Sequence, residues 1–269
     1  MIEKRTDSEA MVLGPGDADA PTDAERAQKE HYNRIAAAYE AHYDDPFARR
    51  YREEYLEQPM LDGLELSGRQ VLEAMCGSGM TTAALLSRGA QVTGIDISEA
   101  CIESFQARWP QCRAVCGSIT SSGMPAGSFD AVVVVGGLHH LQPDVHPAID
   151  EIHRLLRVGG SLCFMEPHTG SLADTMRRQW YKRDLIFGRN EAAIDVDGLK
   201  RAYADRFEFV REVYGGNLGF LLVFNSFVFR IPLRLKPLYS PAVLRLEAFI
   251  QRFQGKRLSC IVIAQWRKR

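Results

Sequence analysis

A turn with two glycines, followed after a further apolar run by one acid, is the stretch of the sequence best suited to chemistry. Glu73 precedes the turn, Gly77 and Gly79 lie within it, and Asp96 stands 23 residues after Glu73. The glycines let the backbone approach a ligand closely. An acid at the tip of a strand is placed to accept hydrogen bonds from both hydroxyls of a ribose. The pattern predicts a nucleoside-binding site.

Two kinds of nucleoside ligand fit such a turn. A dinucleotide fingerprint needs a third small residue at the position of Thr82 and an accessible helix N-terminus to hold pyrophosphate. The segment from Gly77 to Thr82 satisfies only half of this requirement. The residues by themselves therefore leave open an NAD-dependent oxidoreductase as one alternative.

The turn lies within a regular alternation of short apolar runs and amphipathic segments. Strands are expected over residues 70–74, 91–95, 113–116, 129–135 and 161–166. Helices are expected over residues 79–88, 98–108 and 145–157. This order predicts an α/β fold with a parallel sheet, helices on both faces and right-handed crossovers.

The pattern changes after Glu166. Residues 171–206 are predicted to be mainly helical, 207–214 to form a strand, 217–254 to be apolar and partly helical, and 257–266 to form the final strand. A hairpin between the last two strands would need only a few residues. The intervening residues are therefore expected to form an insertion that packs over the site or against another subunit.

Five segments follow from these patterns. Residues 1–21 are acidic and rich in Gly, Pro and Ala, which predicts a disordered tail. Thr22 and Glu25 form a capping box that predicts a helix. The predicted segments are a tail over residues 1–21, a helical cap over 22–60, a core over 61–168, insertions with a sixth strand over 169–256, and the final strand of the sheet over 257–269.

Four sequence motifs occur in order: LEAMCGSG, GIDIS, GSFDAVVVVGGLHHL and IHRLLRVGGSL. In type and spacing they resemble the class I S-adenosylmethionine-dependent methyltransferases, in particular the small-molecule, type 11-like branch. The resemblance covers about residues 30–166 and the last strand. It implies a Rossmann-like doubly wound sheet of seven strands, mostly parallel with an antiparallel last strand, with helical insertions on the substrate side. It also implies S-adenosyl-L-methionine as cofactor.

The resemblance also implies a set of cofactor-binding residues. They are Tyr32, Tyr39, Glu73, Met75, Cys76, Gly77, Gly79, Asp96, Ile97, Ser118, Ile119 and Gly136. Glu73 and the backbone of the turn would hold the methionine end, and Asp96 the ribose. Met75 stands where the family usually has Gly, so its side chain must point away from the ligand. Ser118 stands where an Asp commonly meets the adenine amino group, so that contact is expected from the backbone of Ile119.

Methyl transfer from a sulfonium is an in-line displacement, so the protein has mainly to align the reactants and exclude water. A hydroxyl or carbon nucleophile also needs a base. The expected catalytic candidates are Glu166, His168 and His140, which follow predicted strands; His139 is a weaker candidate, and His140 has the alternative role of a wall residue. The spacing of His, Cys, Asp and Glu predicts no metal site.

Composition limits the partners. The chain has 33 basic and 34 acidic residues, a balance unsuited to holding nucleic acid. Residues 230–269 carry ten basic residues and only Glu247 as an acid. With aromatic residues of the insertion such as Phe220 and Phe224 as walls, this end predicts a small-molecule substrate that is amphiphilic or phosphate-bearing. A solvated basic face is the plainer alternative, and the apolar insertion also allows a homo-oligomer.

The terminus and the cysteines suggest a location. The first ten residues are charged where a signal peptide would be apolar, and the apolar run at residues 218–229 is too short to cross a bilayer. The six cysteines form no CxxC pattern, which favours reduced thiols and a cytoplasmic protein.

We therefore expect a methyltransferase acting on a small molecule of natural-product, terpenoid, prenyl diphosphate or sugar-lipid type. A catalytically degenerate binding protein of the same fold is a further alternative to the oxidoreductase.

Overall fold

The computed structural model describes residue 29, residues 42–181 and residues 192–269. The predicted tail, the capping box at Thr22 and the two tyrosines Tyr32 and Tyr39 lie outside the described residues.

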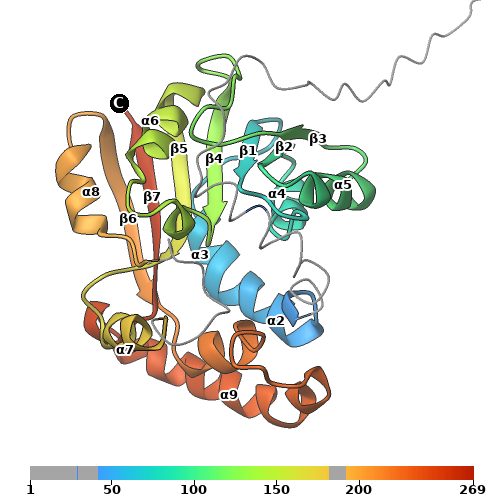
Figure 1. Cartoon of the computed structure of the whole chain (residues 1–269), viewed down its shortest axis with the longest axis vertical. Helices are drawn as coiled ribbons and strands as arrows, with labels where there is room; N and C mark the ends of the chain where they lie inside the picture. The colour runs from blue at the N-terminus through green and yellow to red at the C-terminus, as the bar shows by residue number, and fades with distance from the viewer. Residues whose placement is uncertain (1–28, 30–41, 182–191) are drawn as a thin grey trace, which may run out of the picture.

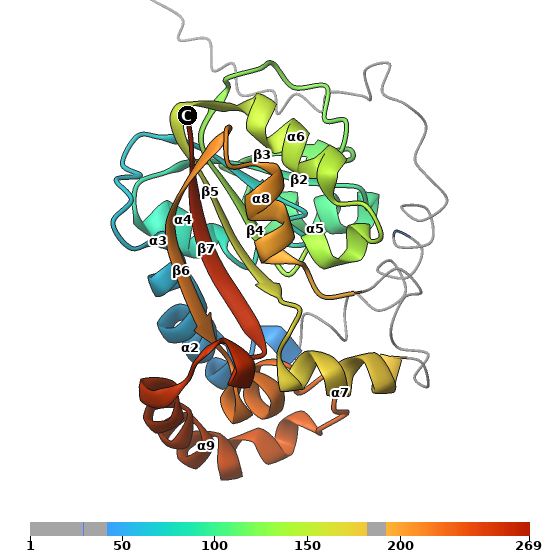
Figure 2. The same cartoon turned by 90° about the vertical axis from the view of Figure 1, so that its left-hand side faces the viewer.

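A seven-stranded sheet forms the centre of the molecule (Figures 1 and 2). Its strands are β1 (Gln70–Ala74), β2 (Gln91–Asp96), β3 (Arg113–Cys116), β4 (Phe129–Val135), β5 (Leu156–Pro167), β6 (Phe207–Gly215) and β7 (Ile261–Lys268). The strand order is β3-β2-β1-β4-β5-β7-β6, and β7 runs antiparallel to both of its neighbours. The predicted fold class, a mostly parallel seven-stranded sheet with an antiparallel last strand, is confirmed.

Helices cover both faces of the sheet (Figure 2). One face packs on α6 (His146–Leu155) and α8 (Val196–Ala202), and the other on α3 (Gln58–Leu61), α4 (Thr82–Ser87) and α5 (Glu99–Arg108). Strand β4 lies between β1 and β5, and its residues Ala131 to Val134 are at most 2% exposed. A continuous apolar run is what a strand covered on both faces requires.

A second layer of helices lies beyond the carboxyl ends of the parallel strands, where the β4 arrow points in Figure 1. It consists of α2 (Pro46–Arg52), the π-helix η1 (Glu53–Glu57), the π-helix η3 (Phe220–Phe224) and α9 (Lys236–Ile250). The helix α7 (Leu172–Tyr181) lies at the same end of the molecule. The insertion between β6 and β7 thus packs against the segment that precedes the sheet.

Aromatic contacts join these two segments. The ring of Phe224 lies 4.9 Å from that of Tyr43 and 5.7 Å from that of Tyr51, measured between centroids. Phe224 is 4% exposed. The expectation that Phe224 lines a substrate pocket is therefore wrong, because its ring is used to attach the insertion to α2.

Some element boundaries differ from those expected. The final strand begins at Ile261 rather than at residue 257, because Lys256–Leu258 forms the 3₁₀ turn η6. Strand β5 begins at Leu156, five residues before the expected start, and ends at Pro167. Helix α4 begins at Thr82 because Gly79 has a φ of +81°, which a helix does not accommodate.

No helix within the described ranges is long and apolar enough to cross a membrane.

The close packing of β2 on α5 yields a stability prediction. A Cβ added at Gly94 would lie 2.7 Å from ring carbons of Phe105 and 2.9 Å from Cys76 Sγ. We expect Gly94→Ala to lower the free energy of unfolding by about 1–3 kcal/mol, because an overpacked core must shift. Gly117→Ala is the matched control, since its Cβ would meet only Ile95 Cδ1, at 3.9 Å. Denaturant titration measures both variants, and equal stability of the two would contradict the packing.

Candidate active site

The turn after β1 depends on left-handed backbone conformations. Gly77 has a φ of +54° and Gly79 of +81°, and Met75 adopts +54° despite having a side chain. Left-handed φ values are uncommon outside glycine, which explains why glycine is usual at the position of Met75. The Met75 side chain lies against Gly137, where an added Cβ would be 2.8 Å from its sulfur. The side chain is thus accommodated by the glycine after β4.

Glu73 is a buried carboxylate that stabilises the turn through hydrogen bonds. It is 5% exposed, and it accepts hydrogen bonds from the Thr81 N–H, at 3.1 Å, and from the Thr82 hydroxyl. Burial raises the pKa of Glu73 to about 7, and these hydrogen bonds oppose the rise. Both carboxylate oxygens are therefore engaged within the loop, and the contact of Glu73 with a methionine end stays a prediction.

Asp96 lies at the end of β2 beside the same turn. Its Oδ2 accepts a hydrogen bond from Gly77 N–H at 2.9 Å, and its Oδ1 accepts one from Ser98 N–H at 2.9 Å. Burial raises the pKa of Asp96, and the backbone hydrogen bonds oppose that rise. The side chain stays partly exposed to solvent. The structure thus brings together the glycine turn and the acid on which the nucleoside prediction rests.

Trp109 is a residue of this site that the sequence did not reveal. Its indole Nε1 donates to the carbonyls of Ser78, at 3.2 Å, and of Gly79, at 3.1 Å. A Cβ at Gly79 would come within 2.6 Å of the same nitrogen. Gly79 is therefore required by close packing as well as by its φ. The sequence motif around the turn does not predict this contact, because Trp109 lies at the end of α5, 30 residues away from Gly79 in the chain.

The wall expected beside an adenine is formed after β2 and β3. Ile97 is partly exposed, and Ile119 is 3% exposed. The Ser118 hydroxyl lies 2.8 Å from the Thr120 hydroxyl and accepts a hydrogen bond from Thr120 N–H at 3.1 Å. Ser118 therefore shapes its own turn. Its predicted contact with an adenine, and that of the Ile119 backbone, stay predictions.

The segment after β4 contains His139, a candidate for acid–base chemistry. Gly136 has a φ of +64°, and its N–H donates to the Met165 carbonyl at 2.8 Å. The chain then forms the 3₁₀ turn η2 (Leu138–Leu141). A Cβ at Gly136 would lie 3.9 Å from His139 Cε1. The imidazole of His139 therefore borders the wall that Gly136 forms.

Glu166, at the end of β5, holds this turn in place. Its Oε1 accepts from the N–H groups of Gly137, at 2.8 Å, and Leu138, at 2.7 Å, and its Oε2 lies 2.8 Å from His139 Nδ1. Glu166 is completely buried, and burial raises its pKa to about 7. The carboxylate thus orients His139, and it can act on a substrate only through that ring.

The two other histidines differ in placement. His140 is 9% exposed, and its ring centroid lies 3.9 Å from that of His139. His168 is 1% exposed, its Nδ1 lies 2.9 Å from the Thr169 carbonyl oxygen, and its ring packs edge-on against Tyr214. Burial lowers the pKa of His168. The structure therefore groups Glu166 with His139 and His140, whereas His168 packs towards β6.

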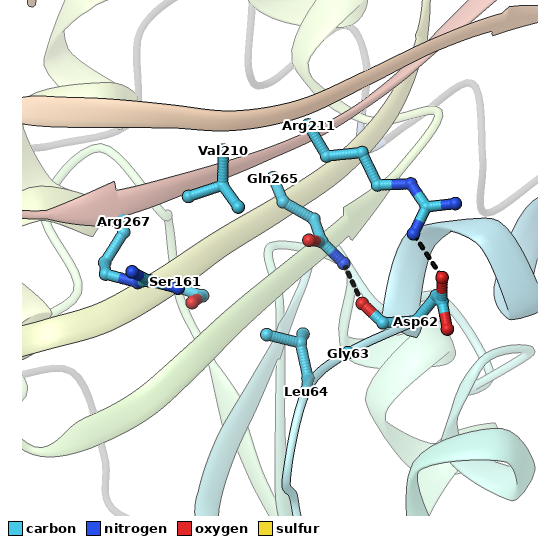
Figure 3. A pocket seen from close by; sticks show the side chains of 8 residues that line it. All are labelled: Asp62, Gly63, Leu64, Ser161, Val210, Arg211, Gln265 and Arg267. Atoms are coloured by element: carbon cyan, nitrogen blue, oxygen red, sulfur yellow. Dashed lines mark hydrogen bonds and ion pairs between the residues drawn. The ribbon is translucent and has the colours of Figure 1, made fainter.

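A shallow cavity of about 420 Å³ lies elsewhere (Figure 3). It is lined by the segment after α3 and by strands β5 to β7, with Arg211 paired to Asp62 and Gln265 donating to the Asp62 carbonyl at 2.9 Å. Ser161, near the start of the parallel part of β5, contributes to it, so the cavity lies away from the carboxyl ends of the strands. It contains none of the predicted site residues.

Comparison with known proteins shows similarity to methyltransferases. Residues 71–160 match a family profile described as "Methyltransferase domain". A probable S-adenosylmethionine-dependent methyltransferase of Mycolicibacterium smegmatis is 30% identical over 137 residues, which are 50% of this chain and 53% of that protein. A ubiquinone biosynthesis O-methyltransferase of Pseudomonas aeruginosa is 34% identical over 103 residues, 36% of this chain and 44% of that protein. The chain thus spans about half the length of these curated relatives.

Residues 71–160 of the chain are therefore similar to the methyltransferase domain of S-adenosylmethionine-dependent enzymes.

A solved structure shows the same fold over nearly the whole chain. The magnesium protoporphyrin IX methyltransferase of Synechocystis, determined with SAH bound, superposes with a TM-score of 0.61 at 15% identity, covering 92% of this chain and 100% of that one. The relative from Mycolicibacterium smegmatis is named as S-adenosylmethionine-dependent, and the Synechocystis structure contains SAH, the form of that cofactor left after methyl transfer.

The residues of this chain fit that cofactor. A Cβ placed on Gly77 would meet no atom within 4 Å, so the turn faces open space. The Asp96 carboxylate faces the same turn and keeps acceptor capacity for a ribose hydroxyl, because it offers about four acceptor sites and the N–H groups of Gly77, Ile97 and Ser98 occupy at most three. Within the described part of the chain no group of three or more His, Cys, Asp or Glu could hold a metal ion.

The Asp96 assignment predicts a binding defect. We expect Asp96→Ala to weaken S-adenosylmethionine binding about tenfold or more, because hydrogen bonds to a charged group contribute about 1.5–3 kcal/mol each. Titration calorimetry measures the affinity. Asp130→Ala is the control, since Asp130 pairs with Arg157 at the start of β4 and should leave binding unchanged. Equal affinity of Asp96→Ala and the parent would disprove the ribose contact.

Proposed function

We propose that this protein transfers the methyl group of S-adenosylmethionine to a hydroxyl oxygen of a small molecule. The observation that carries the proposal is the pair His139–Glu166, with 2.8 Å between His139 Nδ1 and Glu166 Oε2 beside the predicted cofactor wall. A hydroxyl is a weak nucleophile until a base removes its proton, whereas a neutral amine needs no such base. A histidine oriented by a buried carboxylate is suited to that step.

The bound cofactor supplies an electrophilic methyl group on a positively charged sulfur. His139 supplies the base. With Nδ1 engaged by Glu166, Nε2 is the ring nitrogen that would accept the proton from the substrate hydroxyl. Glu166 fixes the tautomer and the ring orientation, and an ionised Glu166 stabilises the imidazolium that results. The three backbone N–H groups of residues 137–139 that donate to Glu166 keep the carboxylate in place.

This assignment changes the order of the predicted catalytic residues. His139 is the proposed base and Glu166 its positioning residue. His140 packs beside His139 as a wall residue, in line with its alternative role. His168, which contacts Tyr214, has no proposed catalytic part.

Two further observations support a hydroxyl on a small apolar or amphiphilic acceptor. One relative that resembles the core carries the name ubiquinone biosynthesis O-methyltransferase. The layer beyond the strand ends is rich in apolar residues, of which Phe220, Phe227 and Tyr239 are only partly buried. An acceptor that approaches from this side meets mainly hydrocarbon, as small-molecule sites usually provide.

The base assignment predicts a kinetic defect without a binding defect. We expect His139→Gln to lower kcat about 10²-fold to 10⁴-fold, the usual contribution of general-base catalysis. S-adenosylmethionine affinity should stay within about twofold, because His139 is not a predicted cofactor ligand. His153→Gln on α6, whose ring packs on Phe207, is the control. Full kcat in His139→Gln would rule out His139 as the base, and turnover is measured with labelled cofactor and candidate phenols and alcohols.

The raised pKa of Glu166 predicts a pH dependence. Since the pKa of Glu166 is about 7, lowering the pH through 7 protonates the carboxylate and removes its charge from beside His139. We expect kcat at saturating cofactor to fall about tenfold per pH unit below 7 and to level off above it. A kcat that is constant between pH 5.5 and 8 would contradict the pairing.

Unfolding measurements on the same samples separate this effect from acid denaturation. The folded-state pKa of Glu57, Glu73 and Glu166 is about 7 for each, above the usual 4.5. Between pH 4.5 and 7 the folded protein therefore binds more protons than the unfolded chain, and these three groups increase the free energy of unfolding as the pH falls. Their effect on stability is opposite in sign to the predicted loss of kcat.

A further inference from the structure

Helix α9 buries polar side chains and exposes apolar ones. Lys236, Ser240 and Glu247 are at most 1% exposed, whereas Leu238 is 80% and Phe249 58% exposed. A helix on the surface of a globular protein normally has the opposite arrangement. The outer side of α9 therefore exposes large apolar side chains to water.

Buried ionic contacts fix this orientation. The Lys236 ammonium donates to the Asp45 carboxylate and, at 3.2 Å, to the His42 carbonyl. Glu247 accepts hydrogen bonds from the Tyr51 hydroxyl at 3.0 Å and from the N–H groups of Asn217 and Gly219 at 2.9 Å. Rotating α9 to hide its apolar side would leave these buried charges without partners, which is strongly unfavourable. The exposure of the apolar side is a fixed feature of the fold.

The apolar side chains form one continuous stripe, which we call the α9 face. Its members are Leu238, Leu246, Phe249 and Phe253. The intervals of eight, three and four residues put them on the same side of a helix, and the 3₁₀ turn η5 (Gln251–Phe253) continues α9 to the last of them. The rings of Phe249 and Phe253 lie 5.5 Å apart. Phe253 is 74% exposed.

Arginines accompany the stripe. Arg245 and Arg252 fall on the same side of α9 by helical spacing, and Arg234 and Arg257 flank it in sequence. All four are exposed, and none of them forms an ion pair with another residue that the structure describes. Glu247 is the only acid between residues 230 and 269, and it is buried. The exposed charged side chains of α9 and η5 are therefore all basic.

The stripe lies at one end of the molecule. In both views α9 forms the outer border beyond the strand ends, and α7 lies at the same end (Figures 1 and 2). Leu172 and Met176, one helical turn apart on α7, are 63% and 74% exposed. Two helices thus present exposed apolar side chains at the end of the molecule that carries the candidate active site.

We propose that the α9 face docks the protein on the surface of an anionic lipid bilayer. Leucine and phenylalanine side chains enter the boundary between headgroups and acyl chains, while the arginines contact lipid phosphates. A second copy of the chain fits this face less well, because a two-fold interface would bring the arginines of both copies together and α9 has no exposed acid to pair with them. Docking in this way requires no membrane-spanning helix and does not depend on which atom is methylated.

Vesicle co-sedimentation of the full-length protein tests the proposal. We expect binding to vesicles that contain phosphatidylglycerol, little binding to pure phosphatidylcholine, and release at high salt. Phe249→Ser with Phe253→Ser should weaken binding about tenfold or more, since two buried apolar side chains are lost. Arg245→Gln with Arg252→Gln should weaken it about tenfold.

A matched control variant changes exposed residues away from α9, at the start of β5 and on α8. Val158→Ser removes an apolar side chain that is 78% exposed near the start of β5, and Arg201→Gln removes an exposed charge from α8. This control variant should bind vesicles as the parent does, and thermal unfolding shows whether each variant is folded. The proposal would be overturned if the parent protein does not bind anionic vesicles, or if the α9 variants bind as tightly as the parent. So would a dimer in sedimentation equilibrium that the phenylalanine variant dissociates, because the face would then be an interface between copies.

Discussion

The hydrogen bond from Gly77 N–H to the Asp96 carboxylate joins the ends of two adjacent parallel strands, and the site depends on it. Strands β1 and β2 pair in register up to Ala74 and Ile95, so the turn and the acid emerge side by side. Gly77 donates this bond from a left-handed conformation, with a φ of +54°. Glu73 beneath the turn and Trp109 beside it hold the remaining backbone, so the loop is shaped before a ligand arrives.

The sheet was predictable because its signal is local. The apolar run of β4 and the polar ends of β1 and β2 appear in the sequence as they do in the structure. The layer of α2 and α9 was less predictable, because hydrophobic periodicity normally indicates which side of a helix is buried. In α9 the buried side is fixed by Lys236 and Glu247 through partners nearly 200 residues away, Asp45 and Tyr51. Composition alone therefore misassigned Phe224 to a pocket.

The candidate site also has one part that local sequence predicts and one part that it does not. Gly77 and Asp96 belong to one short unit of strand, turn, helix and strand, so their proximity follows from spacing. The pair His139–Glu166 joins the ends of β4 and β5 across 27 residues, and either histidine of the sequence His139-His140 could have met the carboxylate. The direction in which each ring points depends on the 3₁₀ turn after Gly137, which the sequence does not specify. Geometry was needed to distinguish them.

A crystal structure of the protein with S-adenosylhomocysteine would show whether Asp96 binds the ribose. We expect both ribose hydroxyls within hydrogen-bonding distance of the Asp96 carboxylate, with the amino acid end of the ligand along the backbone from Met75 to Gly77. A ligand bound away from the β1–β2 strand ends, or one whose ribose contacts other groups while Asp96 remains bonded only to Gly77 and Ser98, would contradict it.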